Sequence, residues 1–171
     1  MEILAEKLGK FDKFDRIHFI RRDRSQCVCN MPRQGTLPHD LIHFVVESSL
    51  PFRYGFLNLV AAGAEASFAM ELAHDKSLTD IDVEAIQVEA IVEALQTQLW
   101  GAYFDFASFD EANQLACSAR GKTALAINEE QSLQLYQTVL DLFEQWQALP
   151  FHSSMPLHFD DANESEHVSA S

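Results

Sequence analysis

The spacing of hydrophobic and polar residues changes along the chain, and near its start it is typical of strands. Ile17 and Phe19 alternate with polar side chains, and a second such stretch follows the polar run Arg22-Asp23-Arg24-Ser25. A period of two is typical of strands with one buried face. We therefore predict a β-hairpin in which Phe14–Arg21 pairs with Gln26–Met31 and the polar run forms the turn.

Helical spacing dominates the rest of the chain. The clearest helix is predicted from about residue 80 to Gly101, because apolar residues recur there at intervals of four and three. These apolar residues are Ile81, Ala85, Val88, Val92, Leu95 and Leu99. Capping-box patterns predict two further helices, one from Ser108 and one from Asn128. Shorter helices are expected over residues 1–9, from about residue 37 to 50, and after Pro51.

These elements predict an α+β fold with a predominantly helical, bundle-like core that carries an N-terminal β-hairpin. A chain of 171 residues is long enough for one such domain, which we place at residues 1–150. Residues 151–171 are rich in serine and acidic side chains. We therefore expect them to form a largely disordered tail.

The charge of the chain is unevenly distributed. Residues 1–53 contain nine Lys/Arg and seven Asp/Glu, whereas the remainder contains three Lys/Arg and nineteen Asp/Glu, so the net charges of +2 and −16 sum to −14. An acidic body repels nucleic-acid phosphates. Arg21, Arg22 and Arg24 could still make a local nucleic-acid contact, and the alternative is that they belong to a plain hairpin turn. We therefore expect no nucleic-acid partner. We also expect no membrane partner, since no apolar run reaches 18 residues.

The cysteines and the N-terminus bear on localisation. Cys27, Cys29 and Cys117 form an odd and sparse set, which argues against a disulfide framework and for a reducing compartment. The first ten residues lack the apolar core and the cleavage site of a secretory signal. We therefore expect a cytoplasmic protein.

The candidate chemistry lies in the helix predicted to begin near residue 37. His39, His43 and Glu47 are spaced at i, i+4 and i+8, so they share one side of that helix, and Asp40 lies beside them. Two imidazoles and a carboxylate in this arrangement can bind a divalent metal ion. His39, His43 and Glu47 are the candidate ligands, and Asp40 and Glu47 are the candidate catalytic groups. The alternative is an ordinary polar helix edge.

Two resemblances involve this helix. The run His39-Asp40-x-x-His43 resembles the His-Glu-x-x-His motif of zinc proteases, but Asp40 replaces the glutamate that acts as general base and no further Gly-x-x-His follows, so protease activity is not implied. The longer segment from Met31-Pro32-Arg33 through Leu37-Pro38-His39-Asp40-Leu41-Ile42-His43-Phe44-Val45-Val46-Glu47 to Leu59-Val60-Ala61-Ala62-Gly63 resembles a set of small bacterial proteins with no assigned activity. That resemblance implies no function.

Other motifs are weaker. Gly121-Lys122-Thr123 ends like a phosphate-binding loop, but Ala116 stands where that loop requires its first glycine, so no cofactor-binding motif is complete. Cys27 and Cys29 without a second pair are a weak metal signal. His74 can join the His39/His43 side only if the fold brings the two together.

Two functions follow from these observations. The preferred interpretation is a non-enzymatic binding or assembly module that forms a homo-oligomer or binds a protein partner. Its contact would be the hairpin or the aromatic cluster Trp100, Tyr103, Phe104, Phe106 and Phe109. The alternative is a metal-dependent, hydrolase-like enzyme that uses the His-Asp-x-x-His-x-x-x-Glu helix.

Overall fold

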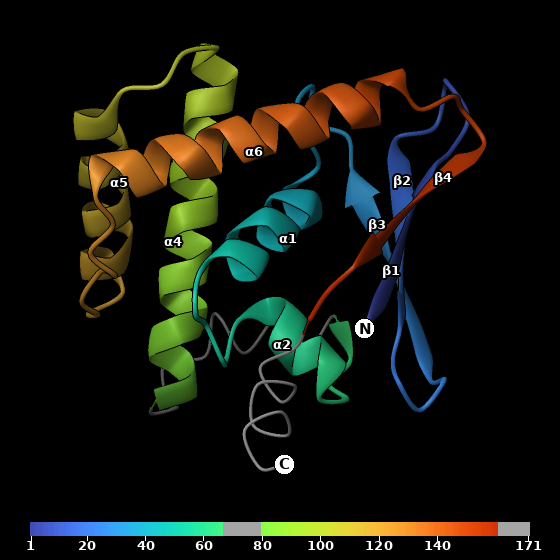
Figure 1. Cartoon of the computed structure of the whole chain (residues 1–171), viewed down its shortest axis with the longest axis horizontal. Helices are drawn as coiled ribbons and strands as arrows, with labels where there is room; N and C mark the ends of the chain where they lie inside the picture. Colours follow the sequence, from blue (N-terminus) through green and yellow to red (C-terminus); the bar gives the residue numbers. More distant parts are fainter. Residues whose placement is uncertain (67–79, 161–171) are drawn as a thin grey trace.

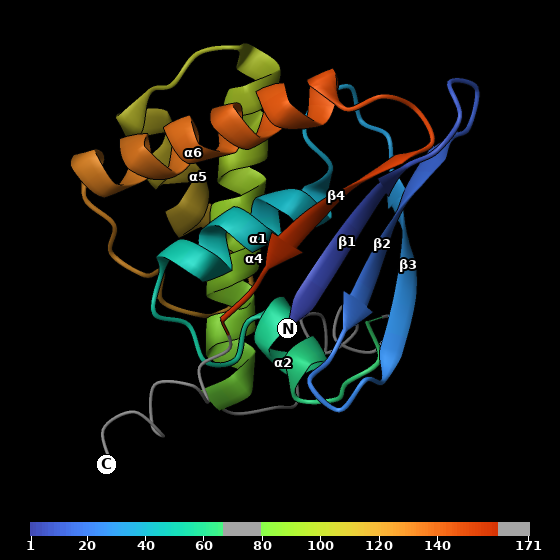
Figure 2. The same cartoon turned by 45° about the vertical axis from the view of Figure 1, so that its right-hand side comes forward.

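The computed structural model describes residues 1–66 and 80–160, with the side chains of residues 80–82 excepted. It confirms the predicted α+β class. A four-stranded antiparallel sheet stands on one side of the molecule and the helices stack against its inner face (Figures 1 and 2).

The sheet has the strand order β3-β2-β1-β4. Its strands are β1 (Glu2–Lys7), β2 (Phe14–Ile20), β3 (Gln26–Pro32) and β4 (Ser153–His158). The predicted hairpin is confirmed as β2 paired with β3, and its turn closes through a hydrogen bond from the Arg21 N–H to the Ser25 carbonyl of 2.9 Å.

Two strands correct the sequence predictions. The helix expected over residues 1–9 is wrong, because that segment forms β1, in which Ile3 and Ala5 are buried between neighbours on both sides. The expected start of the disordered tail is also wrong, because Ser153–His158 pairs with β1 as β4. Residues 161–171 lie outside the described part of the chain.

The helices follow the sequence more closely. They are α1 (His39–Ser49), α2 (Phe56–Ala61), α4 (Asp80–Gly101), α5 (Phe106–Ala119) and α6 (Glu129–Ala148). The capping box at Asn128 and Gln131 is present, whereas α5 is capped by Asp105, which accepts a hydrogen bond from the Ser108 N–H, so the cap predicted at Ser108 is wrong. The sequence also favours an extension of the helix after Pro51, or a separate short helix, over residues 68–74, which lie outside the described residues.

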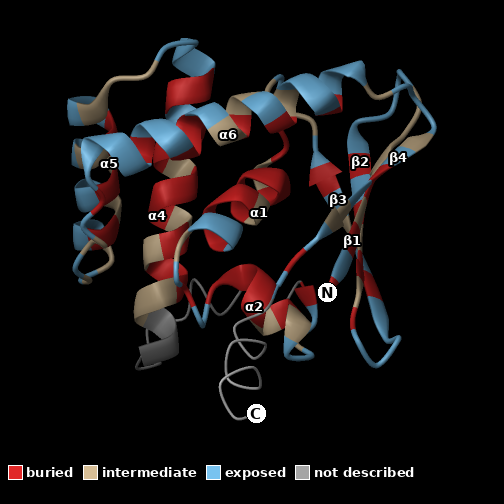
Figure 3. Cartoon of the chain, in the orientation of Figure 1, coloured by how far each residue is buried: buried red, intermediate tan, exposed pale blue. Residues whose placement is uncertain are grey.

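Helix α1 lies at the centre of the molecule, between the sheet and α4 (Figures 1 and 3). Its apolar side chains Leu41, Ile42 and Val46 are fully buried, and they share one core with Phe19 of β2 and Leu95 of α4. Burial of this kind stabilises a fold by roughly 1.5–3 kcal/mol per large side chain. Because the core fixes how α1 is rotated, it also fixes the direction of the polar side of that helix.

Two basic side chains, the half-buried Lys7 and the buried Arg21, fasten the sheet to the helices. The Lys7 ammonium donates to the carbonyls of Trp146, Gln147 and Leu149 and so caps the end of α6. Arg21 is buried and donates to the carbonyls of Val60 and Ala64 at the end of α2. Arg21, the first arginine of the run at the hairpin turn, therefore has a structural role. No described helix is long and apolar enough to cross a membrane.

Candidate metal site

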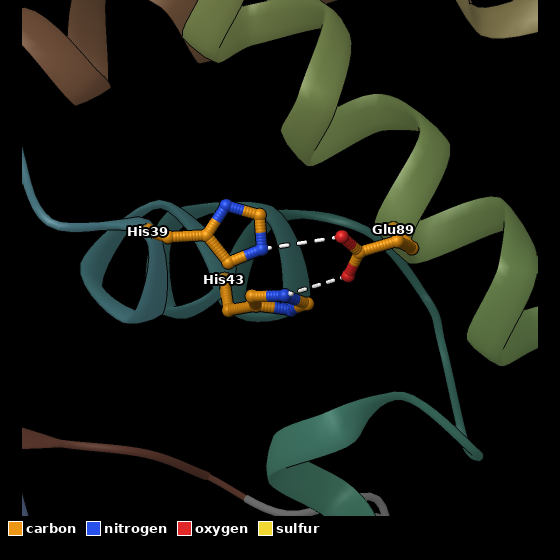
Figure 4. A group of neighbouring side chains, drawn as sticks. All are labelled: His39, His43 and Glu89. Carbon is orange, nitrogen blue, oxygen red and sulfur yellow. Dashed lines mark hydrogen bonds and ion pairs between the residues drawn. The ribbon is translucent and has the colours of Figure 1, made fainter. Parts of the chain in front are cut away.

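The polar side of α1 meets a carboxylate of α4. His39 and His43 occupy successive turns of α1, and their rings lie 5.0 Å apart between centroids. The Nε2 atom of His39 lies 3.2 Å from one carboxylate oxygen of Glu89, and the Nε2 atom of His43 lies 3.2 Å from the other (Figure 4). Two imidazoles and one carboxylate therefore converge on a single point.

The opposite nitrogen of each ring has its own acceptor. The Nδ1 atom of His43 lies 3.2 Å from Oε1 of Glu47, and the Nδ1 atom of His39 lies 3.1 Å from Oε1 of Gln96. Gln96 donates its own amide N–H to Oε1 of Gln34, which fixes the direction of its carbonyl. Metal-binding histidines have this support, because a hydrogen bond at one nitrogen sets the tautomer and the orientation of the other.

Glu47 is itself held in place by the start of α2. Its second oxygen accepts a hydrogen bond of 2.9 Å from the Leu57 N–H, and its side chain is completely buried. Gly55 makes room for this contact, because a Cβ atom at that position would clash with Oε2 of Glu47. The chain between α1 and α2 is therefore shaped around the carboxylate that supports His43.

The structure brings together two of the three predicted ligands. His39 and His43 face the same point, as expected, but Glu47 lies at the far nitrogen of His43 and the converging carboxylate belongs to Glu89. Sequence reasoning missed Glu89 because it lies 46 residues from His43 on another helix. The available signal was its position next to Val88 in the apolar stripe of α4, where a flanking side chain borders the neighbouring helix.

The other sequence candidates are less directly involved. Asp40 is buried beside the two histidines, and burial raises the pKa of its carboxyl group. It is not one of the three side chains that converge. His74 lies outside the described residues. Burial raises the pKa of the Cys29 thiol to about 11, which does not favour the thiolate needed for metal binding.

The predicted aromatic cluster is divided between the surface and the core. Trp100 and Tyr103 are exposed, whereas Phe109 is fully buried and packs near Phe104 with ring centroids 6.0 Å apart. The cluster therefore serves partly as core, and its exposed members lie at the end of α4.

Burial and the neighbouring charged groups shift the pKa values of His43 and Glu89 in opposite directions. Burial would lower the pKa of His43, but the hydrogen bonds and charges of Glu47 and Glu89 outweigh it and raise that pKa to about 10. Burial would likewise raise the pKa of Glu89, but His39 and His43 hold it well below its usual range. Without a metal ion, His43 therefore binds a proton at both nitrogens near neutral pH.

The geometry also suits a divalent cation in place of protons. The three candidate ligand atoms lie within 4.8 Å of one another. Two ligand atoms about 2.1 Å from one ion at a tetrahedral angle lie about 3.4 Å apart, and each Nε2 atom lies 3.2 Å from its own oxygen of Glu89. A divalent ion bound here would displace the proton that His43 carries at Nε2.

The site is not sealed from solvent. The side chains of His39 and Glu89 are 19% and 18% exposed, whereas that of His43 is 7% exposed. An ion between them would have water or another ligand on its open side.

The sequence matches no family model, no curated protein and no solved structure.

Proposed function

We propose that the protein is a divalent-metal-dependent enzyme of the hydrolytic class, with the metal ion bound by His39, His43 and Glu89. The observation that carries this proposal is the convergence of the two Nε2 atoms on one carboxylate, with each ring supported at Nδ1. Structural zinc sites are closed by four protein ligands, whereas catalytic sites use three, often two histidines and a glutamate, and leave one position open. The three converging described side chains and their partial exposure support the catalytic kind.

The residues divide into two roles under this proposal. His39, His43 and Glu89 hold the ion, and Glu47 and Gln96 orient the two imidazoles. A bound ion of this kind polarises a carbonyl or phosphoryl oxygen and lowers the pKa of a bound water, so that water can attack near neutral pH. Hydrolysis consumes only the substrate and that water, so no redox partner is required.

The first test is elemental analysis of protein purified without a His tag or chelator, followed by titration of the metal-free protein with Zn²⁺ and Co²⁺. The expected result is one equivalent of metal in the wild type and loss of tight binding in Glu89→Gln. Glu93→Gln is the matched control, because Glu93 lies one turn further along α4 and bonds Arg120 instead. A wild type that takes up no stoichiometric metal would overturn the proposal.

A second candidate, the binding or assembly module, has one supporting observation. Val28, His18, Leu4 and Pro156 occupy facing positions across the four strands, on the side of the sheet opposite the core. Val28 is 52% exposed, so this row presents apolar surface. Self-association through it predicts a homodimer in light scattering that Val28→Glu dissociates, and a monomeric wild type at micromolar concentration would overturn this candidate.

A further inference from the structure

A basic side chain lies close to the proposed metal site. Glu89 and Glu93 are four residues apart on α4, so they are neighbours on its surface. Arg120, at the end of α5, donates to both carboxylate oxygens of Glu93 at 3.0 and 3.4 Å. Its guanidinium group therefore lies about one helical turn from a metal ligand.

The position of this guanidinium group is well defined. A third hydrogen bond, of 3.1 Å, runs from Arg120 to the Ala116 carbonyl and ties the side chain to its own helix. The Arg120 side chain is 27% exposed, so solvent or a ligand reaches it. The hydrogen bonds to Glu93 raise the pKa of Arg120, and the charge of Glu89 raises it further, which agrees with the two groups lying near each other.

Stability alone does not account for this arrangement. Glu93 is 42% exposed, and an ion pair that exposed contributes roughly 0–1 kcal/mol. Positive charge is also scarce in this part of the chain, since three Lys/Arg stand against nineteen Asp/Glu after Arg53. One of those three lies next to the site, where it offsets an acidic surface that would otherwise repel anions.

We propose that the substrate of the metal site carries an oxyanion, either a phosphate ester or a carboxylate, and that Arg120 binds it beside the metal ion. Glu93 and Ala116 take three of the five N–H donors of the guanidinium group, so its other edge, formed by Nε and Nη2, can pair with either oxyanion through two parallel hydrogen bonds. A metal ion and an arginine one turn apart give one anion two points of attachment. This inference rests on the proposed metal site.

The test uses the full-length protein loaded with Co²⁺, whose visible absorption reports on its ligands. Inorganic phosphate and acetate are titrated separately into wild type and Arg120→Gln. We expect at least one of the two anions to change the spectrum and to bind at least about tenfold more weakly to the variant, as for loss of a charge-assisted hydrogen bond. The anion that binds more tightly identifies the kind of oxyanion that the substrate carries.

Arg16→Gln is the matched control, because Arg16 is an exposed arginine paired with Glu6 on the sheet. It should bind the anions as the wild type does. Equal anion affinities in Arg120→Gln and wild type, or no anion binding by Co²⁺-loaded protein, would overturn the inference while leaving the metal site intact. Failure to bind Co²⁺ at all would overturn the metal site and this inference with it.

Discussion

Two carboxylates in this protein, Asp15 and Glu89, have different partners and different consequences. Asp15 of β2 faces Arg33, which donates to both of its oxygens, and it also accepts a hydrogen bond of 2.9 Å from the Leu8 N–H. Glu89 of α4 faces His39 and His43 instead. Both carboxylates face nitrogen donors, but only the imidazoles that face Glu89 can give up a proton and bind a metal ion.

The difference between the partners separates a structural ion pair from a candidate metal site. The arginine side chain stays charged in proteins and has no lone pair for a metal ion. Neutral histidine, in contrast, is the commonest metal ligand once its proton is lost. We therefore assign the Asp15–Arg33 pair to fastening the loop between β1 and β2, and we propose metal binding for the Glu89 cluster.

The largest expected effect concerns the structural pair. Asp15→Ala removes the acceptor of the Arg33 and Leu8 donors, so it should lower the free energy of unfolding by about 3 kcal/mol. Urea denaturation measures this loss, which should be the same with and without Zn²⁺. Arg16→Ala, at an exposed pair of 3.9 Å, should change stability by less than about 0.5 kcal/mol. A Zn²⁺-dependent loss in Asp15→Ala would contradict the distinction between the two carboxylates.

The next effect concerns the metal site. His43→Ala removes a ligand, so it should weaken Zn²⁺ binding by more than the roughly 10–100-fold typical of losing only a supporting residue. Competition with a chromophoric chelator measures the affinity. His18→Ala is the control, because His18 also contacts a glutamate, Glu6, at 3.2 Å but lies on the sheet. Equal losses in the two variants would indicate that the effect is not specific to the site.

A smaller effect is expected from the support of His43. Gly55→Ala places a methyl group against Glu47, which must move away from His43. Zn²⁺ affinity should fall by about tenfold, at the low end for a supporting residue. Gly101→Ala, where a Cβ atom meets nothing within 4 Å, should leave Zn²⁺ affinity unchanged in isothermal titration. Unchanged binding in Gly55→Ala would show that the position of Glu47 does not matter.

The most gradual effect is the dependence of stability and of Zn²⁺ affinity on pH. The pKa of His43 is raised from 6.5 to about 10 in the metal-free protein, so its contribution to stability is complete below pH 6.5 and is lost as pH rises through 10. Metal must displace the same proton, so Zn²⁺ affinity should rise by about tenfold per pH unit between pH 7 and 9. Thermal unfolding with Zn²⁺ and with EDTA should therefore diverge as pH rises. A constant difference would contradict the exchange of proton for metal.

Local signals in the sequence were enough for the hairpin and the long helices. The turn residues between β2 and β3 and the capping box at Asn128 act over a few neighbouring positions, so the chain carries them without tertiary information. The prediction for β1 was wrong because the short run Glu2–Lys7 fits the spacing of a helix or of a strand. Pairing with β2 and β4 makes it a strand. β4 was not predicted because its partner strand, β1, lies about 150 residues away in the sequence.

The same distinction applies to the site. The spacing of His39 and His43 on one helix is a local property, and it was predicted. Glu89 was not, because the packing of α1 on α4 selects it among several glutamates of α4. Glu47 was predicted as a ligand because it continues the same helical stripe, and the loop around Gly55 instead draws it to the other side of the His43 ring.

The most direct test of the metal site is diffraction from crystals of the protein grown with Zn²⁺, collected above and below the zinc absorption edge. The account predicts an anomalous peak within about 2.0–2.2 Å of the Nε2 atoms of His39 and His43 and of a Glu89 oxygen. Both imidazoles hydrogen-bonded directly to Glu89, with no anomalous peak between the three side chains, would contradict it.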